Sequence, residues 1–350
     1  MKFGITYFAQ SQENETIAAA FHRSIESCVS AEQFGFSHFM IGEQHFTPYL
    51  LNPDCLQYFS YLSAKTKKIR FCPGISVLPH HHPIQFAERV AMLDIMSEGR
   101  IDIGIGRGYQ RRAYDGLNIN MEDSAERFDE YLQVVKQAFS PDPFSFTGTY
   151  YSNVEPIAVY PKPTQQPHPP IWVAGVSFHS LEKIGRQDHG FLKNPLDNLD
   201  VCKGQVETYK AARRAAGLPQ SGDRIRMDRM TVVLDETSEA RETADQLMRR
   251  FQSLFSGAVA YKPPPGKSYE HYGSEQYRKD RNISGGYDFE HQESFSIFCD
   301  PKAAIERITY LRDVVGITEL SFAVGMAGMS LDLQRRIMRT LAEKVIPHFS

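Results

Sequence analysis

The feature that most constrains this fold is an alternation, repeated along the chain, between short apolar runs and longer segments of helical period. Eight runs have the length and composition of strands, and they lie at residues 2–8, 38–41, 69–78, 101–106, 171–174, 190–193, 226–234 and 319–324. After each run, apolar residues recur at steps of three and four, as on one face of a helix. This order indicates α/β architecture with a parallel sheet.

Several of the helical segments carry start and stop signals. Pro83 is suited to the first helical position, where its missing N–H costs nothing, and Gly99 ends that segment. Asp300 and Pro301 supply an N-cap and a first-position proline, and Gly316 ends the helix that follows. The other helices are expected at residues 17–33, 53–64, 124–139, 181–187, 199–216, 240–255 and 333–346.

Eight strands, each followed by a helix, is the number that forms a closed (β/α)8 TIM barrel. The alternative is a doubly wound open sheet, but its dinucleotide signature would stand in the first strand–turn–helix, and residues 6–14 contain no glycine. At 350 residues the chain exceeds the roughly 250 of a typical barrel. The excess falls mainly in a proline-rich connection, 141–170, and in an insertion after strand seven, 257–298. We therefore expect residues 1–350 to form one barrel domain.

Composition and charge exclude several classes of partner. Lysine and arginine (39) nearly balance aspartate and glutamate (42), so no basic field is expected to bind nucleic acid. No apolar run approaches the roughly 18 residues of a membrane helix, and the first residues show no signal-peptide pattern. We expect a cytoplasmic protein without a membrane partner. The five cysteines lack C-x-x-C spacing, which favours buried, reduced thiols over a disulfide framework or a zinc knuckle.

In a barrel of this kind the active site lies at the C-terminal ends of the strands. The candidate residues there are Glu43, Gln44, His45, Gly74, Ile75, Gly106, Arg107, Tyr109, Val176, Ser177 and Ser180. Glycines allow a close approach to a ligand, and the Arg107 guanidinium suits a phosphate or, equally well, a structural ion pair. The serine turn before residue 181 would bind an anion at a helix N-terminus or serve as an ordinary N-cap. A phosphate shared between the two would explain both.

Histidines and aromatic residues also gather near these strand ends. Consecutive residues cannot all face one ion, so we expect residues 80–82 to form a loop and cap, with no metal site. Glu43 and His45 would form an acid/base pair if they meet, although a packed, hydrogen-bonded histidine is the simpler interpretation. The aromatic side chains that flank the strand ends, and that would suit a flat ring system, are Phe8, Phe46, Tyr49 and Tyr109.

A set of short blocks occurs in order along nearly the whole chain. They are Met1-Lys2-Phe3-Gly4, Glu43-Gln44-His45-Phe46-Thr47, Val77-Leu78-Pro79 with His82-Pro83, Leu93-Asp94 with Ser97 and Gly99-Arg100, Gly104 with Gly106-Arg107-Gly108, Ile171-Trp172-Val173-Ala174-Gly175, Gly286-Tyr287-Asp288-Phe289, and Val345-Ile346-Pro347-His348-Phe349. With these blocks the chain resembles the bacterial luciferase-like, flavin-dependent monooxygenase family. Each block is weak by itself, and together they are specific to that family.

The resemblance implies a TIM barrel that uses dioxygen and reduced FMN supplied by a separate flavin reductase to oxygenate a small organic substrate. It places the FMN phosphate on Arg107 and on the turn formed by Val176, Ser177 and Ser180. It places the isoalloxazine ring on Gly74 and Ile75, where the family often has a non-proline cis peptide. Tyr109, Glu43 and His45 would line the ring and the substrate. Residues 257–298 would form a lid, and helices of the second and third units would pair two copies as a homodimer.

The sequence departs from the family pattern at Gln44. Luciferases have a histidine there, to which the acid/base role is assigned, and glutamine cannot take up a proton near neutral pH. This departure puts the luciferase reaction and light emission in question, but it does not affect flavin binding. Three alternatives stay open. They are a deazaflavin (F420)-dependent oxidoreductase, a flavin-binding protein without turnover, which Gln44 favours, and a metal-dependent barrel hydrolase.

Overall fold

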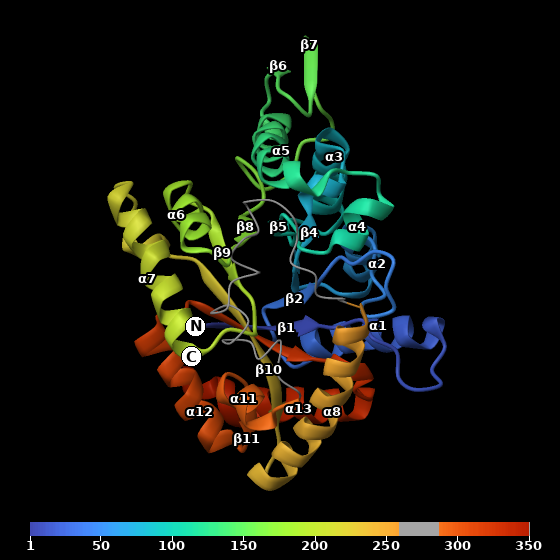
Figure 1. Ribbon diagram of the computed structural model, residues 1–350, viewed down its shortest axis with the longest axis vertical. Coiled ribbons are helices and arrows are strands. Elements are labelled where there is room, and N and C mark those ends of the chain that lie inside the picture. The colour runs from blue at the N-terminus through green and yellow to red at the C-terminus, as the bar shows by residue number, and fades with distance from the viewer. Residues whose placement is uncertain (259–286, 350) are drawn as a thin grey trace.

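The structure is a computed structural model that describes residues 1–258 and 287–349. Its centre is a parallel sheet (Figure 1), and the barrel strands are β1 (Lys2–Tyr7), β2 (His38–Ile41), β3 (Arg70–Pro73), β4 (Ser76–Val77), β5 (Ile103–Gly106), β8 (Ile171–Ala174), β9 (Gly190–Lys193), β10 (Ile225–Val233) and β12 (Glu319–Val324). Neighbouring strands follow the order β3-β2-β1-β12-β10-β9-β8-β5-β4. A parallel bridge joins Phe71 of β3 to Ile101, just before β5, so the sheet curls into a barrel and the predicted fold class is confirmed.

Helices surround the barrel (Figure 1), and the long ones are α1 (Ile17–Gln33), α2 (Cys55–Lys65), α3 (Pro83–Met96), α5 (Ser124–Phe139), α6 (Phe178–Arg186), α7 (Leu199–Ala215), α8 (Thr237–Ala258), α12 (Pro301–Tyr310) and α13 (Leu331–Thr340). Asp300 accepts a hydrogen bond from the Ala303 amide at the start of α12, and Pro301 occupies its first turn, as predicted. Gly316 ends the same unit with φ +85°. None of the described helices combines the length and apolar character needed to cross a bilayer.

The structure differs from the predicted elements in three places. The third strand is not continuous over 69–78, because a non-proline cis peptide between Gly74 and Ile75 separates β3 from β4. The proline-rich connection contains an antiparallel hairpin of β6 (Phe144–Thr147) and β7 (Ser152–Ile157), which projects from the barrel (Figure 1). A short helix, α4 (Arg111–Gly116), follows β5 and had no counterpart among the expected elements.

Most of the predicted lid, residues 259–286, lies outside the described residues. The part that follows forms α11 (Phe289–Ser294) and β11 (Ile297–Cys299), and β11 adds a parallel strand to the end of β10. The lid itself and the single-domain boundary at 1–350 stay predictions.

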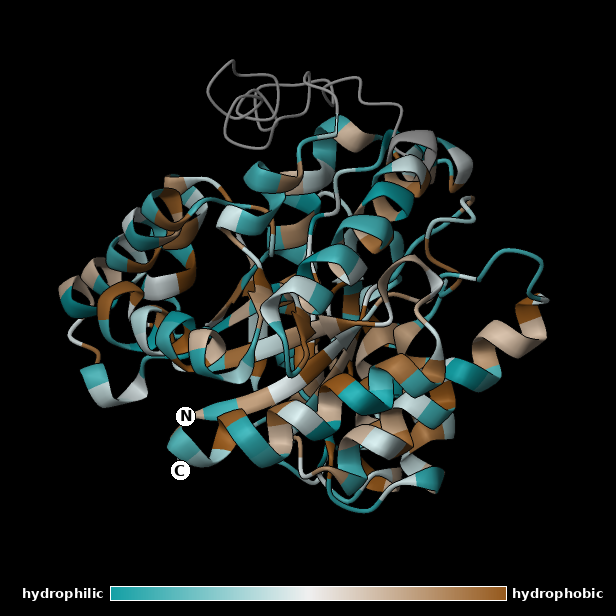
Figure 2. Cartoon of the chain, turned by 90° about the horizontal axis from the view of Figure 1, so that it is seen from below, coloured by the Kyte–Doolittle hydropathy of each residue, from teal (hydrophilic) through white to brown (hydrophobic). Residues whose placement is uncertain are grey.

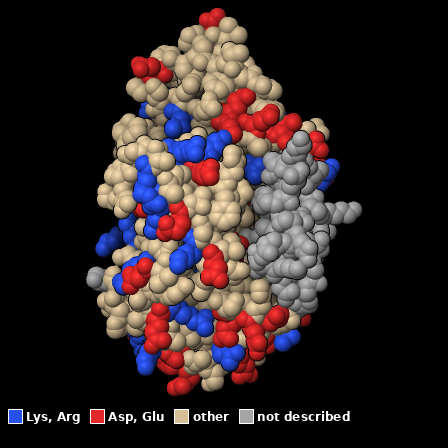
Figure 3. All heavy atoms as spheres, turned by 60° about the vertical axis from the view of Figure 1, so that its left-hand side comes forward, with Lys and Arg blue, Asp and Glu red and all other residues tan. Residues whose placement is uncertain are grey.

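Apolar side chains concentrate on the strands and on the inward faces of the helices, while polar ones face outward (Figure 2). The five cysteines are buried and free, which agrees with the expectation of reduced thiols. On the face shown in Figure 3, lysine and arginine side chains lie interspersed with aspartate and glutamate. The barrel therefore has an apolar core and a surface of mixed charge.

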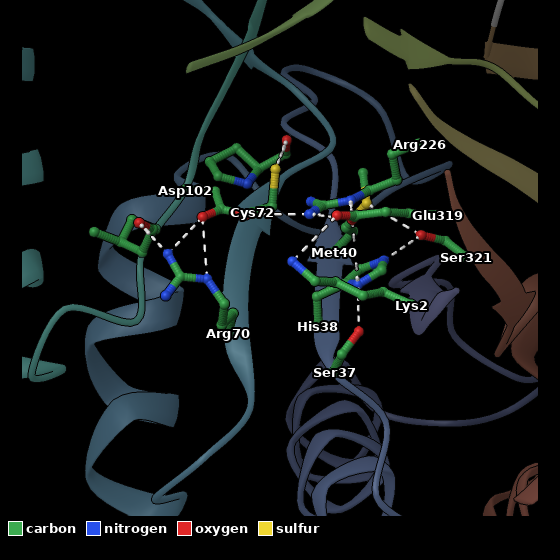
Figure 4. A network of polar contacts seen from close by, with 12 residues as sticks. Lys2, Ser37, His38, Met40, Arg70, Cys72, Asp102, Arg226, Glu319 and Ser321 are labelled. Carbon is green, nitrogen blue, oxygen red and sulfur yellow. Dashed lines mark hydrogen bonds and ion pairs between the residues drawn. The ribbon is translucent and has the colours of Figure 1, made fainter. Parts of the chain in front are cut away.

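The N-terminal half of the barrel interior holds a network of buried charged groups (Figure 4). Arg226 donates from Nε to Glu319 Oε2 at 2.7 Å and from Nη2 to Asp102 Oδ2 at 3.1 Å. Its guanidinium also lies 4.1 Å from the centroid of the Trp172 ring. The His38 imidazole packs on the same cluster, with Nδ1 3.9 Å from Glu319. This network occupies the N-terminal end of the barrel interior, formed by the first residues of β2, β10 and β12 and by Asp102 before β5.

Candidate active site

A cavity of about 550 Å³ opens at the C-terminal ends of the barrel strands. All the residues predicted from the sequence line it, namely Glu43, Gln44, His45, Gly74, Ile75, Gly106, Arg107, Tyr109, Val176, Ser177 and Ser180. They come from the loops after β2, β5 and β8 and from the interruption between β3 and β4. The structure thus brings the predicted residues together in one site.

The serine turn forms the N-terminus of α6 at the cavity wall. Ser177 caps the helix by accepting a hydrogen bond from the Ser180 amide at 3.3 Å, and the two hydroxyl oxygens lie 2.9 Å apart. The ordinary capping role is therefore confirmed, and it coexists with an opening of the turn toward the cavity. Because β5 pairs with β8, Arg107 follows a strand adjacent to the one that precedes this turn. A guanidinium and a helix N-terminus on one cavity suit an anion.

Gly106 packs closely against the Ile75 side chain at the β3–β4 interruption. A Cβ atom at Gly106 would lie 2.4 Å from Ile75 Cδ1, a distance that real Cβ contacts do not show. The absence of a side chain lets the Gly74–Ile75 segment reach the cavity wall beside β5. A flat ligand can then approach backbone rather than side chains on this side.

Glu43 is the buried centre of a polar cluster on the other side of the cavity. Its Oε1 accepts a hydrogen bond from His45 Nε2 at 3.0 Å, and its Oε2 accepts one from His81 Nε2 at 2.8 Å. His80 Nδ1 lies 3.6 Å from Oε1. Burial alone would raise the pKa of Glu43, but the hydrogen bonds from His45 and His81 and the nearby His80 imidazole outweigh it and hold the pKa below its ordinary value. The carboxyl is therefore ionised at neutral pH.

Two of these histidines differ in what their second nitrogen contacts. Arg89 Nη2 lies 2.8 Å from His81 Nδ1, and since a guanidinium can only donate, Nδ1 accepts and Nε2–H donates to Glu43. Asp54 holds Arg89 in turn, at 2.6 Å. His45 also directs Nε2 at Glu43, so its Nε2 carries the hydrogen and Nδ1 is the basic nitrogen. Its ring is partly exposed to the cavity. The predicted contact between Glu43 and His45 is confirmed, and His45 is the imidazole suited to move a proton.

The loop of consecutive histidines does not point at one centre. His80 and His81 approach different oxygens of Glu43, whereas His82 precedes the first residue of α3 and packs on the Tyr151 ring. Within the described residues, Glu43, His45 and His80 are the group whose ligand atoms lie within 4.8 Å of one another, so a metal ion, if one bound, would be held there. The absence of a metal stays a prediction.

Of the four aromatic residues expected at the strand ends, three line the cavity and one does not. Phe8, Tyr49 and Tyr109 are in the lining. Phe46 also follows the end of β2, but it is 55% exposed and its ring packs over Gly116. Its backbone has a positive φ of 56°.

Sequence reasoning missed several residues of the lining. Phe251 and Phe255 stand on the apolar stripe of α8, and both pack against Tyr49, with ring centroids 5.8 and 5.5 Å away. Lys193 and Asp228 come from within β9 and β10. The helix stripe was visible as a core face, and only the three-dimensional arrangement reveals that part of this face borders the cavity.

Comparison with known proteins places the fold and site in context. Residues 1–317 match the family described as luciferase-like monooxygenase. The oxygenase component of a flavin-dependent trigonelline monooxygenase from Acinetobacter baylyi is 24% identical over 372 residues, which covers 100% of this chain and 96% of that protein.

Two solved structures share the whole fold. Monooxygenase RslO1 from Streptomyces bottropensis superposes with a TM-score of 0.86 at 25% identity, covering 100% of both chains. The oxygenating constituent of 3,6-diketocamphane monooxygenase from Pseudomonas putida, a type II Baeyer–Villiger monooxygenase solved with FMN, gives 0.81 at 21% identity and covers 99% of this chain and 98% of that one.

Proposed function

The chain belongs to the luciferase-like monooxygenase family, and from that premise we propose that it binds reduced FMN and uses dioxygen to oxygenate a small organic substrate. The observation that carries the proposal is the convergence of Arg107, the serine turn and the Gly74–Ile75 segment on one cavity. A cavity of about 550 Å³ lies within the range of cofactor sites.

The residues fit the parts of FMN. Arg107, with Val176, Ser177 and Ser180, would hold the phosphate by charge-assisted hydrogen bonds and helix N–H groups. On the ring side, the contacts would come from Gly74, Ile75, Gly106 and Tyr109. When bound, the reduced flavin supplies the electrons for the reduction of dioxygen.

The remaining residues of the site supply proton transfer and exclusion of water. Glu43 fixes the His45 ring through Nε2, so that Nδ1 can accept a proton from a reacting group. Gln44 lines the same wall and offers hydrogen bonds without titrating near neutral pH. Phe251 and Phe255 cover the apolar end and keep water from the reacting centre. His45 therefore takes the acid/base role that Gln44 cannot perform.

The proposal includes two protein partners. A separate flavin reductase would supply reduced FMN, as the designation "oxygenase component" of the Acinetobacter relative suggests. A second copy of the chain would pair through α2 and α3, where four large apolar side chains are each about half exposed, namely Tyr61, Met92, Ile95 and Met96. Exposed apolar groups gathered on neighbouring helices are typical of a protein interface.

Flavin binding is tested by fluorescence titration with FMN, and with reduced FMN under anaerobic conditions. Arg107→Ala is expected to weaken binding about 10- to 100-fold, because a hydrogen bond to a charged group contributes about 1.5–3 kcal/mol. Arg111→Ala is the matched control, since Arg111 is an exposed cation four residues away that pairs with Asp115. A protein that binds neither form of FMN, or an Arg107→Ala variant that binds as tightly as the unmodified chain, contradicts the proposal.

Turnover separates the proposal from its alternatives. Oxygen consumption in the presence of NADH, a flavin reductase and a panel of aldehydes, ketones and sulfides supports oxygenation. Hydride transfer to a deazaflavin without oxygen uptake would identify an F420-dependent oxidoreductase. Tight FMN binding with no product from any compound would favour a binding protein, the alternative to which Gln44 points.

A further inference from the structure

One carboxyl group of the cavity lining has no role in the proposed mechanism. Asp228 lies on β10, and its side chain is partly exposed to the cavity. Thr6 on β1 donates a hydrogen bond from Oγ1 to Asp228 Oδ1 at 2.9 Å. Apolar groups from three strands, Met40, Leu192 and Met230, also line the cavity. Asp228 is therefore an acidic group in a lining to which the barrel strands also contribute apolar side chains.

The cations of the surrounding elements are engaged elsewhere. On β10 itself, Arg226 pairs with Glu319 and Asp102, while Arg229 donates to the Pro195 carbonyl. On β9, Lys193 pairs with Asp197. In residues 1–258 and 287–349, no lysine, arginine or histidine lies within ion-pair distance of Asp228.

The other neighbours of Asp228 are neutral. Ser321 is its register partner on β12, and its hydroxyl, like that of Thr6, favours the ionised carboxyl. His38 on β2 contacts Ser321 at 2.6 Å, and burial lowers the pKa of His38 well below its ordinary value, so this imidazole is uncharged. On β3, Cys72 is a buried thiol whose pKa burial raises. Arg226 and Arg229 lie beyond ion-pair distance of Asp228, and their charges lower its pKa less than burial raises it.

We propose that Asp228 is a ligand-binding carboxyl, which accepts a hydrogen bond from a ring N–H of the bound heterocycle. Ring N–H groups are the donors that flavins share with other nitrogen heterocycles, and the inference rests on the proposed flavin function. Burial makes the ionised carboxylate costly, and a ligand N–H adds a donor to the hydroxyls of Thr6 and Ser321 that already favour it. Ligands without the donor would leave the carboxylate short of this hydrogen bond and bind more weakly.

The pH dependence of ligand affinity that follows from this hydrogen bond has a definite direction. Burial raises the pKa of Asp228 to about 6, although Thr6 and Ser321 oppose the rise. A ligand donor favours the ionised form, so binding releases a proton from any carboxyl that still holds one. Affinity is therefore full above pH 7 and falls as the pH drops below about 6, by about tenfold between pH 7 and pH 5.

The test is the dissociation constant of FMN, measured by fluorescence titration between pH 5 and pH 8 for the unmodified protein and for Asp228→Asn. The FMN phosphate is common to both titrations, so the difference between the two profiles isolates Asp228. The unmodified protein is expected to lose about tenfold more affinity than Asp228→Asn between pH 7 and pH 5. Asp235→Asn is the control, because Asp235 is an exposed carboxyl beyond the end of β10 that pairs with Lys344. Parallel pH profiles for the unmodified protein and Asp228→Asn overturn the inference.

A second variant and a second readout keep the inference testable if Asp228→Asn does not fold. Thr6→Val removes a donor that favours the ionised carboxyl, so the midpoint of the FMN affinity profile is expected to move to higher pH; an unmoved midpoint counts against the inference. Carbon-13 NMR of the Asp228 carboxyl in the flavin-free protein is expected to titrate near pH 6, and a midpoint near 4 overturns the inference whatever the flavin does. Failure of the unmodified protein to bind FMN at any pH instead contradicts the proposed function.

Discussion

At the scale of single residues, two imidazoles that contact the same carboxylate are expected to respond differently to protonation. His81 is held between Glu43 and Arg89, and its second nitrogen accepts from a guanidinium that never loses its proton. His45 has the same contact with Glu43 and borders the cavity. Protonation of His81 at Nδ1 would break its hydrogen bond with Arg89. Protonation of His45 at Nδ1 would leave its hydrogen bond to the Glu43 carboxylate in place.

We therefore expect His45→Ala to reduce turnover about 10²- to 10⁴-fold, the usual contribution of a positioned acid or base. FMN affinity should change little, because the proposed phosphate contacts follow β5 and β8, away from His45 after β2. Steady-state rates at saturating FMN, together with the FMN dissociation constant, measure the two effects separately.

His82→Ala is the matched control, since His82 packs on Tyr151 and not on Glu43. Equal losses of turnover in the two variants would show that position 45 has no special part in proton transfer.

The residues of the site were predictable where they follow a strand and unpredictable where they lie inside one. All eleven candidates line the cavity, because the C-terminal ends of parallel strands meet at one end of a barrel. Asp228 and Lys193 belong to β10 and β9, and nothing in the sequence tells which strand residues face a cavity and which a packed interior. That the Phe46 ring packs over Gly116 rather than in the cavity lining could not be read from the sequence.

At the scale of elements, the short buried strands were the most predictable parts of the chain. β2, β8, β9 and β12 have the predicted bounds, since each is a compact apolar run between polar or turn-forming residues. The break between β3 and β4 could not be read from an apolar run that continues through Ile75 and Val77. The β6–β7 hairpin was missed because its residues alternate only between exposed and half-buried, so no strong period marks it.

The exposed side chains of α2 and α3 lead to a prediction for assembly. Ile95→Arg places a charge among the half-exposed apolar groups of α3 and is expected to convert a dimer into a monomer, because an unpaired buried charge costs several kcal/mol. Size-exclusion chromatography with light scattering measures the mass directly.

Val154→Arg provides the comparison, since Val154 is 87% exposed on the β6–β7 hairpin, far along the chain from α3. If the unmodified protein is already monomeric, the predicted interface does not exist. If only Val154→Arg dissociates the dimer, the interface lies elsewhere.

At the scale of the whole molecule, buried histidines make stability depend on pH. Burial lowers the pKa of His189 to about 3, and that of His38 is also lowered. In the unfolded chain a histidine takes up a proton near pH 6.5, whereas the folded protein resists protonation until the pH is far lower. The stability that the neutral rings provide is therefore present above pH 6.5 and is lost as the pH falls below it.

We expect the free energy of unfolding to decline between pH 6 and pH 5, with His189 contributing about 1 kcal/mol per pH unit. In His189→Gln the decline should be shallower by that amount. Urea unfolding followed by circular dichroism at a series of pH values gives the slopes. His22→Gln is the control, because His22 is exposed on α1. If neither His189→Gln nor His22→Gln changes the slope of the unfolding free energy against pH, His189 is not the source of that slope.

The buried network at the bottom of the barrel also determines how the protein can be observed. Trp172, the single tryptophan of the chain, lies against Arg226 within that network, and it stands on β8 two residues before Ala174 of the cavity wall. Its fluorescence emission therefore reports on one known place, between the buried charged network and the cavity at the C-terminal ends of the strands. The chain has its own optical probe, and no label has to be attached near the site to follow what enters it.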